Sequence, residues 1–98
     1  MTPEGKVKAE VKEYLNLLGS DCWYYMPVPM GYGKRGVPDF VCCIRGQFYG
    51  IECKAPGKRS DLTPWQSKEL DAIHAAGGCS VVIEAVDGIK KYFNALLG

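Results

Sequence analysis

The stretch GVPDFVCCIRGQFYGIECK, residues 36–54, decides the fold that we expect for this chain. Residues 37–44 and 47–54 are rich in apolar, aromatic and β-branched side chains, which favour β-strands. Arg45 and Gly46 separate the two runs, and glycine is common in the tight turns between antiparallel strands. The stretch therefore predicts a β-hairpin.

Three charged residues, Asp39, Glu52 and Lys54, stand in this hairpin where apolar side chains would cost less to bury. With a two-residue turn Ile44 opposes Gln47, and counting back along both strands places Asp39 opposite Glu52. A four-residue loop centred on the same turn preserves this pairing. Opposed residues share a face of the sheet, with Cβ atoms roughly 4.5 to 5.5 Å apart. Lys54 lies two residues beyond Glu52 and so shares that face.

Two carboxylates in direct opposition repel each other unless a proton or a cation lies between them. A hard divalent ion such as Mg²⁺ or Mn²⁺ resolves this repulsion, because it takes oxygen ligands and retains bound water. We therefore expect a divalent-metal site at Asp39 and Glu52.

Two polar residues on the predicted helices point toward the same surface. Glu4 lies near the centre of the apolar stripe of the first helix, whereas Glu10 lies on its flank and is the weaker candidate. Gln66 lies on the apolar face of the second helix, from which Trp65 points away. Each also has an ordinary role, since Glu4 complements the helix dipole and Gln66 closes a capping box with Thr63. Their alignment with the charged strand residues favours a functional site.

The rest of the chain completes an α/β pattern in the order αβββαβα, with a mixed sheet flanked by helices. The expected elements are a helix from Thr2 to Gly19, strands over 22–28, 37–44 and 47–54, a helix from Thr63 to Gly77, an apolar and therefore buried strand over 79–86, and a final helix that Asp87 caps. The 98 residues are expected to form a single domain over 1–98.

Charge is balanced overall, with a net charge of +1, so basicity alone does not indicate a nucleic-acid partner. Four cations nevertheless flank the hairpin stretch: Lys34, Arg35, Lys58 and Arg59. If a divalent ion neutralised the hairpin acids, this region would be strongly electropositive and suited to the phosphates of a nucleic acid, whereas scattered solvating charge is the ordinary alternative.

The five cysteines are odd in number, form no C-x-x-C pair, and are mostly part of apolar runs, so we expect free thiols and no zinc site. A catalytic Cys53–His74 pair is disfavoured, because Cys53 should face away from the acids. The sequence shows neither a signal peptide nor an apolar run long enough to span a membrane, and we expect an intracellular protein.

The segments Val37-Pro38-Asp39 and Ile51-Glu52-Cys53-Lys54 resemble the PD-(D/E)XK nuclease motif. Together with Thr2-Pro3-Glu4-Gly5 and Gln66, they are similar to the stand-alone virus-type replication-repair nuclease (VRR-NUC) domains of phages. The resemblance covers nearly the whole chain. It implies a restriction-endonuclease-like αβββαβ core with a mixed central sheet flanked by helices, plus a C-terminal helix.

The resemblance also implies an activity, the divalent-metal-dependent hydrolysis of DNA phosphodiester bonds by an endonuclease. Five side chains match the family's catalytic positions: Glu4, Asp39, Glu52, Lys54 and Gln66. The implied ligands of Mg²⁺ or Mn²⁺ are Asp39, Glu52, the backbone carbonyl of Cys53, and Glu4. The family is further expected to cut branched DNA such as Holliday junctions as a homodimer, and its phage members act inside a bacterial host.

A second hypothesis is a nucleic-acid-binding module without catalysis, in which basic loops hold the backbone and aromatic side chains stack on bases. Its aromatic candidates are Tyr24, Tyr25, Tyr32 and Trp65. This hypothesis accounts for the cations but not for the acids in the hairpin. For a homodimer interface the candidates are Trp65, Tyr92 and Phe93, although the core is the better place for the last two.

Overall fold

The predicted hairpin is present in the computed structural model, which describes residues 1–28 and 33–97. Strand β2 (Phe40–Ile44) pairs antiparallel with β3 (Gln47–Cys53), and Ile44 lies opposite Gln47 as expected. Arg45 and Gly46 have φ angles of 48° and 83°, the left-handed conformation that a two-residue hairpin turn of type I′ requires. The predicted register is therefore confirmed.

Strand β2 begins later than the predicted residue 37, and its neighbours explain why. Pro38 has no backbone N–H to donate to the ladder. The backbone N–H of Cys53 donates instead to Oδ2 of Asp39, at 2.8 Å. A side chain thus takes the place of a ladder hydrogen bond, and the last paired residues are Phe40 and Ile51.

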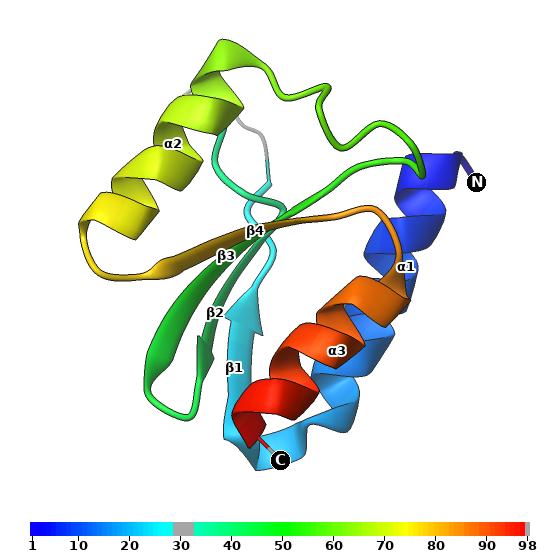
Figure 1. Ribbon diagram of the computed structural model, residues 1–98, viewed down its shortest axis with the longest axis vertical. Helices are drawn as coiled ribbons and strands as arrows, with labels where there is room; N and C mark the ends of the chain where they lie inside the picture. Colours follow the sequence, from blue (N-terminus) through cyan, green and yellow to red (C-terminus); the bar gives the residue numbers. More distant parts are fainter. Residues whose placement is uncertain (29–32, 98) are drawn as a thin grey trace.

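The sheet is mixed and has the strand order β1-β2-β3-β4 (Figure 1). Strand β1 (Cys22–Tyr25) is antiparallel to β2, whereas β4 (Cys79–Ile83) is parallel to β3. Strand β1 is shorter than the predicted 22–28, where Pro27 interrupts the run. Strand β4 is likewise shorter than 79–86, and as an edge strand it is mostly half-buried, which corrects the expectation of a buried strand.

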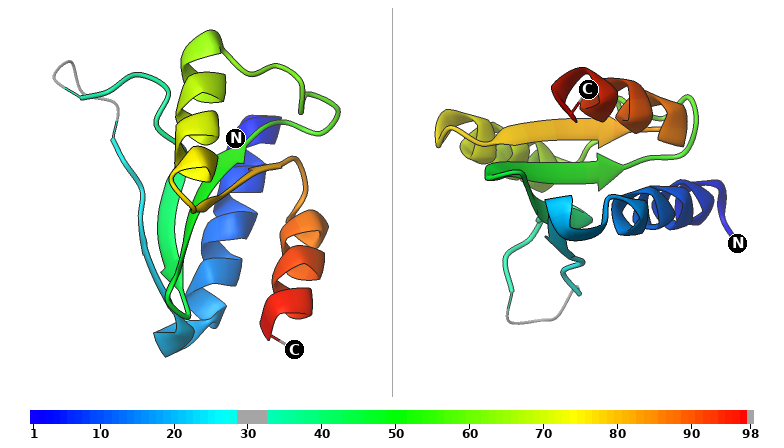
Figure 2. Two further views of the ribbon diagram at one scale, coloured as in Figure 1. Left: turned by 60° about the vertical axis from the view of Figure 1, so that its left-hand side comes forward. Right: turned by 90° about the horizontal axis from the view of Figure 1, so that it is seen from below.

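Helices α1 (Pro3–Leu17) and α3 (Val86–Leu97) lie side by side on one face of the sheet (Figures 1 and 2). Thr2 caps α1 as predicted, and a short 3₁₀ turn (Gly19–Asp21) leads from α1 to β1. Asp87 does not cap α3 but lies in its first turn, since the helix already begins at Val86. None of the helices in the described part of the chain is long and apolar enough to cross a membrane.

The main core lies between these two helices and the sheet. Phe93, fully buried on α3, stacks on Tyr14 with the ring centres 6.3 Å apart. It meets Tyr49 edge-on with the ring centres 4.9 Å apart. The buried core residues are Val7, Val11, Leu15, Phe40, Cys42, Ile44, Tyr49, Ile51, Cys53, Ile83, Ile89 and Phe93. Phe93 is thus a core residue, which was the preferred expectation, while Tyr92 stays 39% exposed.

Helix α2 (Pro64–Ala75) packs on the opposite face of the sheet (Figure 2). The capping box of Thr63 and Gln66 is present and begins the helix where the sequence predicts it. Gly50 permits close packing, because a Cβ atom there would lie 2.7 Å from Cδ1 of Ile73. Side chains alternate along β3, so Glu52 shares the face of Gly50 and points toward α2. The expected mixed α/β fold, αβββαβ with a C-terminal helix, is confirmed.

Candidate active site

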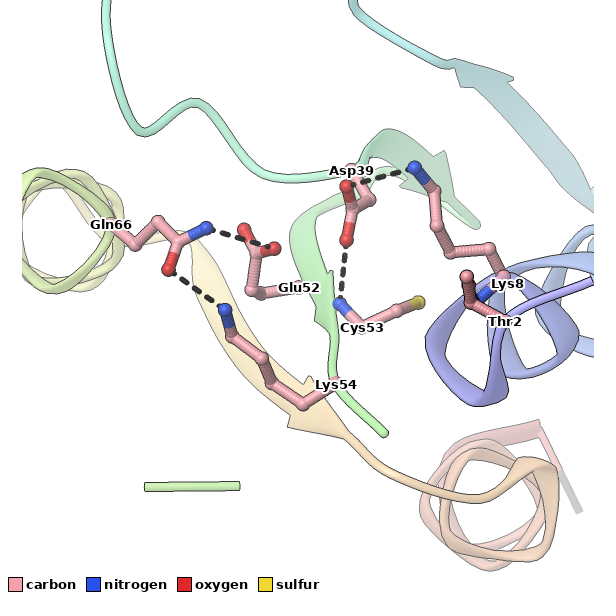
Figure 3. Close-up of polar contacts among 8 residues, drawn as sticks. Thr2, Lys8, Asp39, Glu52, Cys53, Lys54 and Gln66 are labelled. Atoms are coloured by element: carbon pink, nitrogen blue, oxygen red, sulfur yellow. Dashed lines mark hydrogen bonds and ion pairs between the residues drawn. The ribbon is translucent and has the colours of Figure 1, made fainter. Parts of the chain in front are cut away.

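Polar and charged side chains from three elements converge where β2 begins and β3 ends (Figure 3). Asp39 directly precedes β2, Glu52 is near the end of β3, and Lys54 follows it. Gln66 reaches them from the first turn of α2, on the far side of the sheet from α1. The hairpin register places Asp39 close to Glu52, and the packing of α2 on the sheet places the side-chain amide of Gln66 beside them.

Asp39 is held by two different donors. Its Oδ2 accepts the backbone N–H of Cys53 at 2.8 Å, and its Oδ1 lies 3.4 Å from Nζ of Lys8 on α1. The Asp39 side chain is 18% exposed and that of Lys8 is 37% exposed, so the ion pair lies at the surface of the site. These contacts orient the carboxylate and balance its charge.

Glu52 is the most deeply buried acid of the group, with 3% of its surface exposed. Among the described residues its Oε2 has no hydrogen-bond partner, and its Oε1 has a long contact of 3.5 Å from Nε2 of Gln66. Burial, and after it the neighbouring Asp39 carboxyl, raises the pKa of Glu52 to about 8, although Lys54 acts in the opposite direction. This shift favours the protonated form of Glu52 in the metal-free protein.

Lys54 is 8% exposed and donates a hydrogen bond from Nζ to Oε1 of Gln66, at 3.0 Å. The same oxygen accepts the backbone N–H of Thr63 at 2.9 Å, and the Thr63 hydroxyl accepts the N–H of Gln66 in return. The capping role of Gln66 and its contact with the buried lysine therefore coexist in one side chain.

The structure distinguishes between the two acids of α1. Glu4 is half-buried, and its charge contributes to raising the pKa of Glu52. Glu10 lines other cavities, one of them with Pro56 and Glu84, away from Asp39 and Glu52. Glu4 is thus the better placed of the two acids, and its role at the site stays a prediction.

The donors at this site suit a hard divalent cation. Across residues 1–28 and 33–97, no three His, Cys, Asp or Glu side chains gather closely enough to form a ligand group, which leaves the two carboxylates of Asp39 and Glu52. One or two carboxylates with backbone oxygen and water are a usual ligand set for Mg²⁺. The orphaned Oε2 of Glu52 supplies a free ligand oxygen, so the residues fit such an ion. The role of the Cys53 carbonyl stays a prediction.

A cavity of about 560 Å³ opens beside Asp39 and is called here the Asp39–Trp65 cavity. Its charged and polar lining comes from three parts of the chain: Lys8, Lys34, Arg35, Asp39, Thr63, Trp65 and Gln66.

Only two of the four predicted DNA-binding cations, Lys34 and Arg35, line the Asp39–Trp65 cavity. Lys58 is exposed in the loop after β3, and Arg59 lines a different cavity beside β4 and α3. Sequence reasoning missed Lys8, although one signal was available. Lys8 lies four residues after Glu4 and so on the same helix face.

The aromatic candidates are dispersed. Tyr24 donates its hydroxyl to Asn16 and packs on Phe40, while Tyr25 is 54% exposed at the edge of the sheet. Trp65 is half exposed beside the cavity. Tyr32 lies outside the described residues.

Thiol chemistry does not fit the site. Cys53 is fully buried on the face of α1 and α3, and burial raises the pKa of its thiol far above the ordinary value. His74 lies in the last turn of α2, at the end remote from Gln66. The disfavoured Cys53–His74 pair is therefore not assembled.

A search of solved structures finds a chain described as "VRR_NUC domain", with a TM-score of 0.75 and 22% sequence identity. The match covers 96% of this chain and 97% of that chain, so the two share one fold over nearly their whole length. Neither the protein-family models nor the curated proteins contain a match to the sequence. The chain thus has the α/β fold of a VRR-NUC domain, and the resemblance inferred from the motif is confirmed for the fold.

Proposed function

We propose that this protein is a divalent-metal-dependent DNA endonuclease. The observation that carries the proposal is the convergence of Asp39, Glu52 and Lys54 at one end of the hairpin. Supporting it is the fold, which is shared with a chain described as a VRR_NUC domain. A buried acid without a partner and a buried lysine are costly to a small protein, and a catalytic role explains both.

The carboxylates of Asp39 and Glu52 would hold Mg²⁺ or Mn²⁺, together with the backbone carbonyl of Cys53. Glu4, which is not grouped with these two acids in the described part of the chain, would act through its negative charge. When bound, the ion supplies Lewis-acid chemistry to the scissile phosphate and to the attacking water. Glu52 would give up its proton to become a ligand, and the positive charge of the ion would compensate the burial of the resulting carboxylate. Asp39 needs no rearrangement, because the N–H of Cys53 already orients it.

Lys54 carries the remaining chemistry. Its ammonium group orients the attacking water and stabilises the negative charge that develops on the phosphorus oxygens. The hydrogen bond to Gln66 fixes where that ammonium points. Gln66 is thus a positioning residue that acts through Lys54.

In the decisive experiment the purified protein is incubated with labelled DNA in the presence of Mg²⁺, Mn²⁺ or EDTA. The DNA substrates are duplex, single-stranded, flap and four-way-junction DNA. Cleavage that needs the divalent ion and disappears in Glu52→Ala would support the proposal. Glu13→Ala is the matched control, because Glu13 is an exposed acid on α1 away from the site. Binding of DNA that ignores the divalent ion, without cleavage of any substrate, would favour the non-catalytic binding module.

The proposal extends to branched DNA and to a homodimer. One site cuts one strand, so symmetric cutting of a four-way junction needs two copies related by a two-fold axis. A preference for the junction in the same assay, together with a dimer mass by light scattering, would support both. A monomer that cuts junctions symmetrically would overturn the dimer.

A further inference from the structure

The Asp39–Trp65 cavity is larger than the proposed chemistry requires. Two of its lining residues, Asp39 and Gln66, belong to the candidate active site, and the others take no part in the proposed chemistry. Its volume of about 560 Å³ lies within the range of pockets that bind small organic groups. The remaining lining residues therefore indicate what the cavity would bind.

The lining combines positive charge with apolar and aromatic surface. The lining carries three cations, Lys8, Lys34 and Arg35, and one carboxylate, Asp39, which pairs with Lys8 at 3.4 Å. Lys34 has its ammonium 3.4 Å from Glu69, yet its side chain is 76% exposed and free to meet another anion. The net positive charge fits a phosphate, and the apolar surface fits a group attached to that phosphate.

Trp65 supplies the aromatic surface. The guanidinium carbon of Arg35 lies 5.0 Å from the centre of its ring, while half of the Trp65 side chain remains exposed. Arginine planes and indole rings are the groups on which unpaired nucleic-acid bases stack. The pair is therefore suited to receive a base.

The arrangement of this pair is fixed by the backbone. Gly36 has a φ of +77°, and a Cβ atom there would lie 2.3 Å from the backbone carbon of Trp65. The segment that carries Arg35 thus packs directly on the first turn of α2, at a distance that only glycine permits. Such a preformed surface reduces the entropy lost on binding.

We propose that the Asp39–Trp65 cavity is a nucleotide subsite that binds an unpaired base of the DNA strand next to the cleavage position. The base stacks on Trp65 and Arg35, and its phosphate lies against Lys8 and Lys34. Bases inside an intact duplex are stacked on each other and cannot reach an indole ring, so the subsite selects strands with an unpaired nucleotide. This inference rests on the proposed function, since it takes the strand in the cavity to be the one cut.

The test measures binding in EDTA, where metal-dependent cleavage is suppressed. The probe is a short oligonucleotide with one 2-aminopurine, used single-stranded and annealed to its complement, because stacking on an aromatic ring quenches this base. The wild type should bind the single strand more tightly and quench it. Trp65→Ala should lose the quenching and weaken single-strand binding by at least about fivefold, with little effect on the duplex.

Trp23→Ala is the matched control, because Trp23 is 65% exposed on β1 and does not line the cavity. It should bind both probes as the wild type does. Trp65→Phe retains a ring and should restore most of the binding, and Arg35→Ala should weaken it while leaving the indole in place. Single-strand binding by Trp65→Ala at wild-type strength, or an equal loss for both probes, would overturn the subsite.

Cleavage assays separate this inference from the proposed function. In one outcome the wild type prefers the single strand, Trp65→Ala loses this preference, and neither protein cleaves DNA in Mg²⁺ or Mn²⁺. This outcome would support the subsite and reject the nuclease. Metal-dependent cleavage in which Trp65→Ala retains the wild-type ratio of unpaired to paired substrates would keep the nuclease and reject the subsite.

Discussion

Lys54 donates a hydrogen bond from Nζ to Oε1 of Gln66, at 3.0 Å, and this contact joins the end of β3 to the first turn of α2. The acceptor oxygen is the one that caps the helix by accepting the N–H of Thr63. The stability of α2 and the position of the buried lysine therefore depend on the same atom.

Gln66→Ala should reduce both stability and cleavage. Loss of the cap should cost about 1 kcal/mol, and the freed Lys54 should lower kcat. Thr63→Ala is the matched control, since it removes the hydroxyl cap but keeps the contact between Gln66 and Lys54. Thermal midpoints and kcat would be compared for the two variants. An equal loss of kcat in both would show that Gln66 acts only as a cap.

Lys54→Ala should bind DNA at near wild-type strength and lose cleavage by about a hundredfold or more, because its charge is needed mainly in the transition state. Lys12→Ala removes an exposed lysine of α1 and should behave as the wild type. Binding in EDTA and single-turnover cleavage in Mg²⁺ give the two quantities. Wild-type turnover by Lys54→Ala would remove the lysine from the mechanism.

The metal-free protein should lose stability as the pH rises. Burial and Asp39 raise the pKa of Glu52 from 4.5 to about 8, so between these values the folded protein holds a proton that the unfolded chain has released. A rise in pH within this window therefore lowers the free energy of unfolding. The contribution of Glu52 to stability is fully present below pH 4.5.

Denaturant midpoints in EDTA at pH 5 and pH 8 would measure this loss of stability. Glu52→Gln should lose less stability than the wild type between the two pH values, while Glu13→Gln should follow the wild type. Addition of Mg²⁺ at pH 8 should stabilise the wild type but not Glu52→Gln. An equal loss of stability in the wild type and in Glu52→Gln between pH 5 and pH 8 would contradict the inference that Glu52 is buried with a proton.

Lys8→Gln should raise the affinity for Mg²⁺ several-fold, because the ammonium 3.4 Å from Asp39 competes with a divalent ion for that carboxylate. Its effect on the stability of the metal-free protein should stay below about 1 kcal/mol, since the pair is partly exposed. Calorimetric titration with Mg²⁺ measures the affinity, and Lys12→Gln on the same helix is the control. Weaker Mg²⁺ binding by Lys8→Gln would show that Lys8 organises the site instead.

Removal of a phosphate-contacting cation should lower the salt dependence of DNA binding. Lys34→Ala is expected to reduce the slope of log K against log salt by about one, and Arg59→Ala to do the same if the DNA extends to the loop after β3. Titrations at several salt concentrations give the slopes. An unchanged slope for Arg59→Ala would confine the contacts to the Asp39–Trp65 cavity.

The sequence by itself determined the features that depend on local physics. The alternation of the strand residues and the Arg45-Gly46 turn specified the hairpin register, and Thr2 and Thr63 specified where two helices begin. These rules act over a few residues, so they can be read from the order of the amino acids. The pairing that aligns Asp39 with Glu52 follows from them.

Only the tertiary structure decided how segments distant in the sequence meet. It placed Lys8 against Asp39, buried Oε2 of Glu52 with no partner in the described part of the chain, and packed Gly36 onto Trp65. It also placed β4 at an edge of the sheet, where an apolar run had suggested burial. The physical reason is that periodicity predicts which face of an element is buried but not which other element packs against that face.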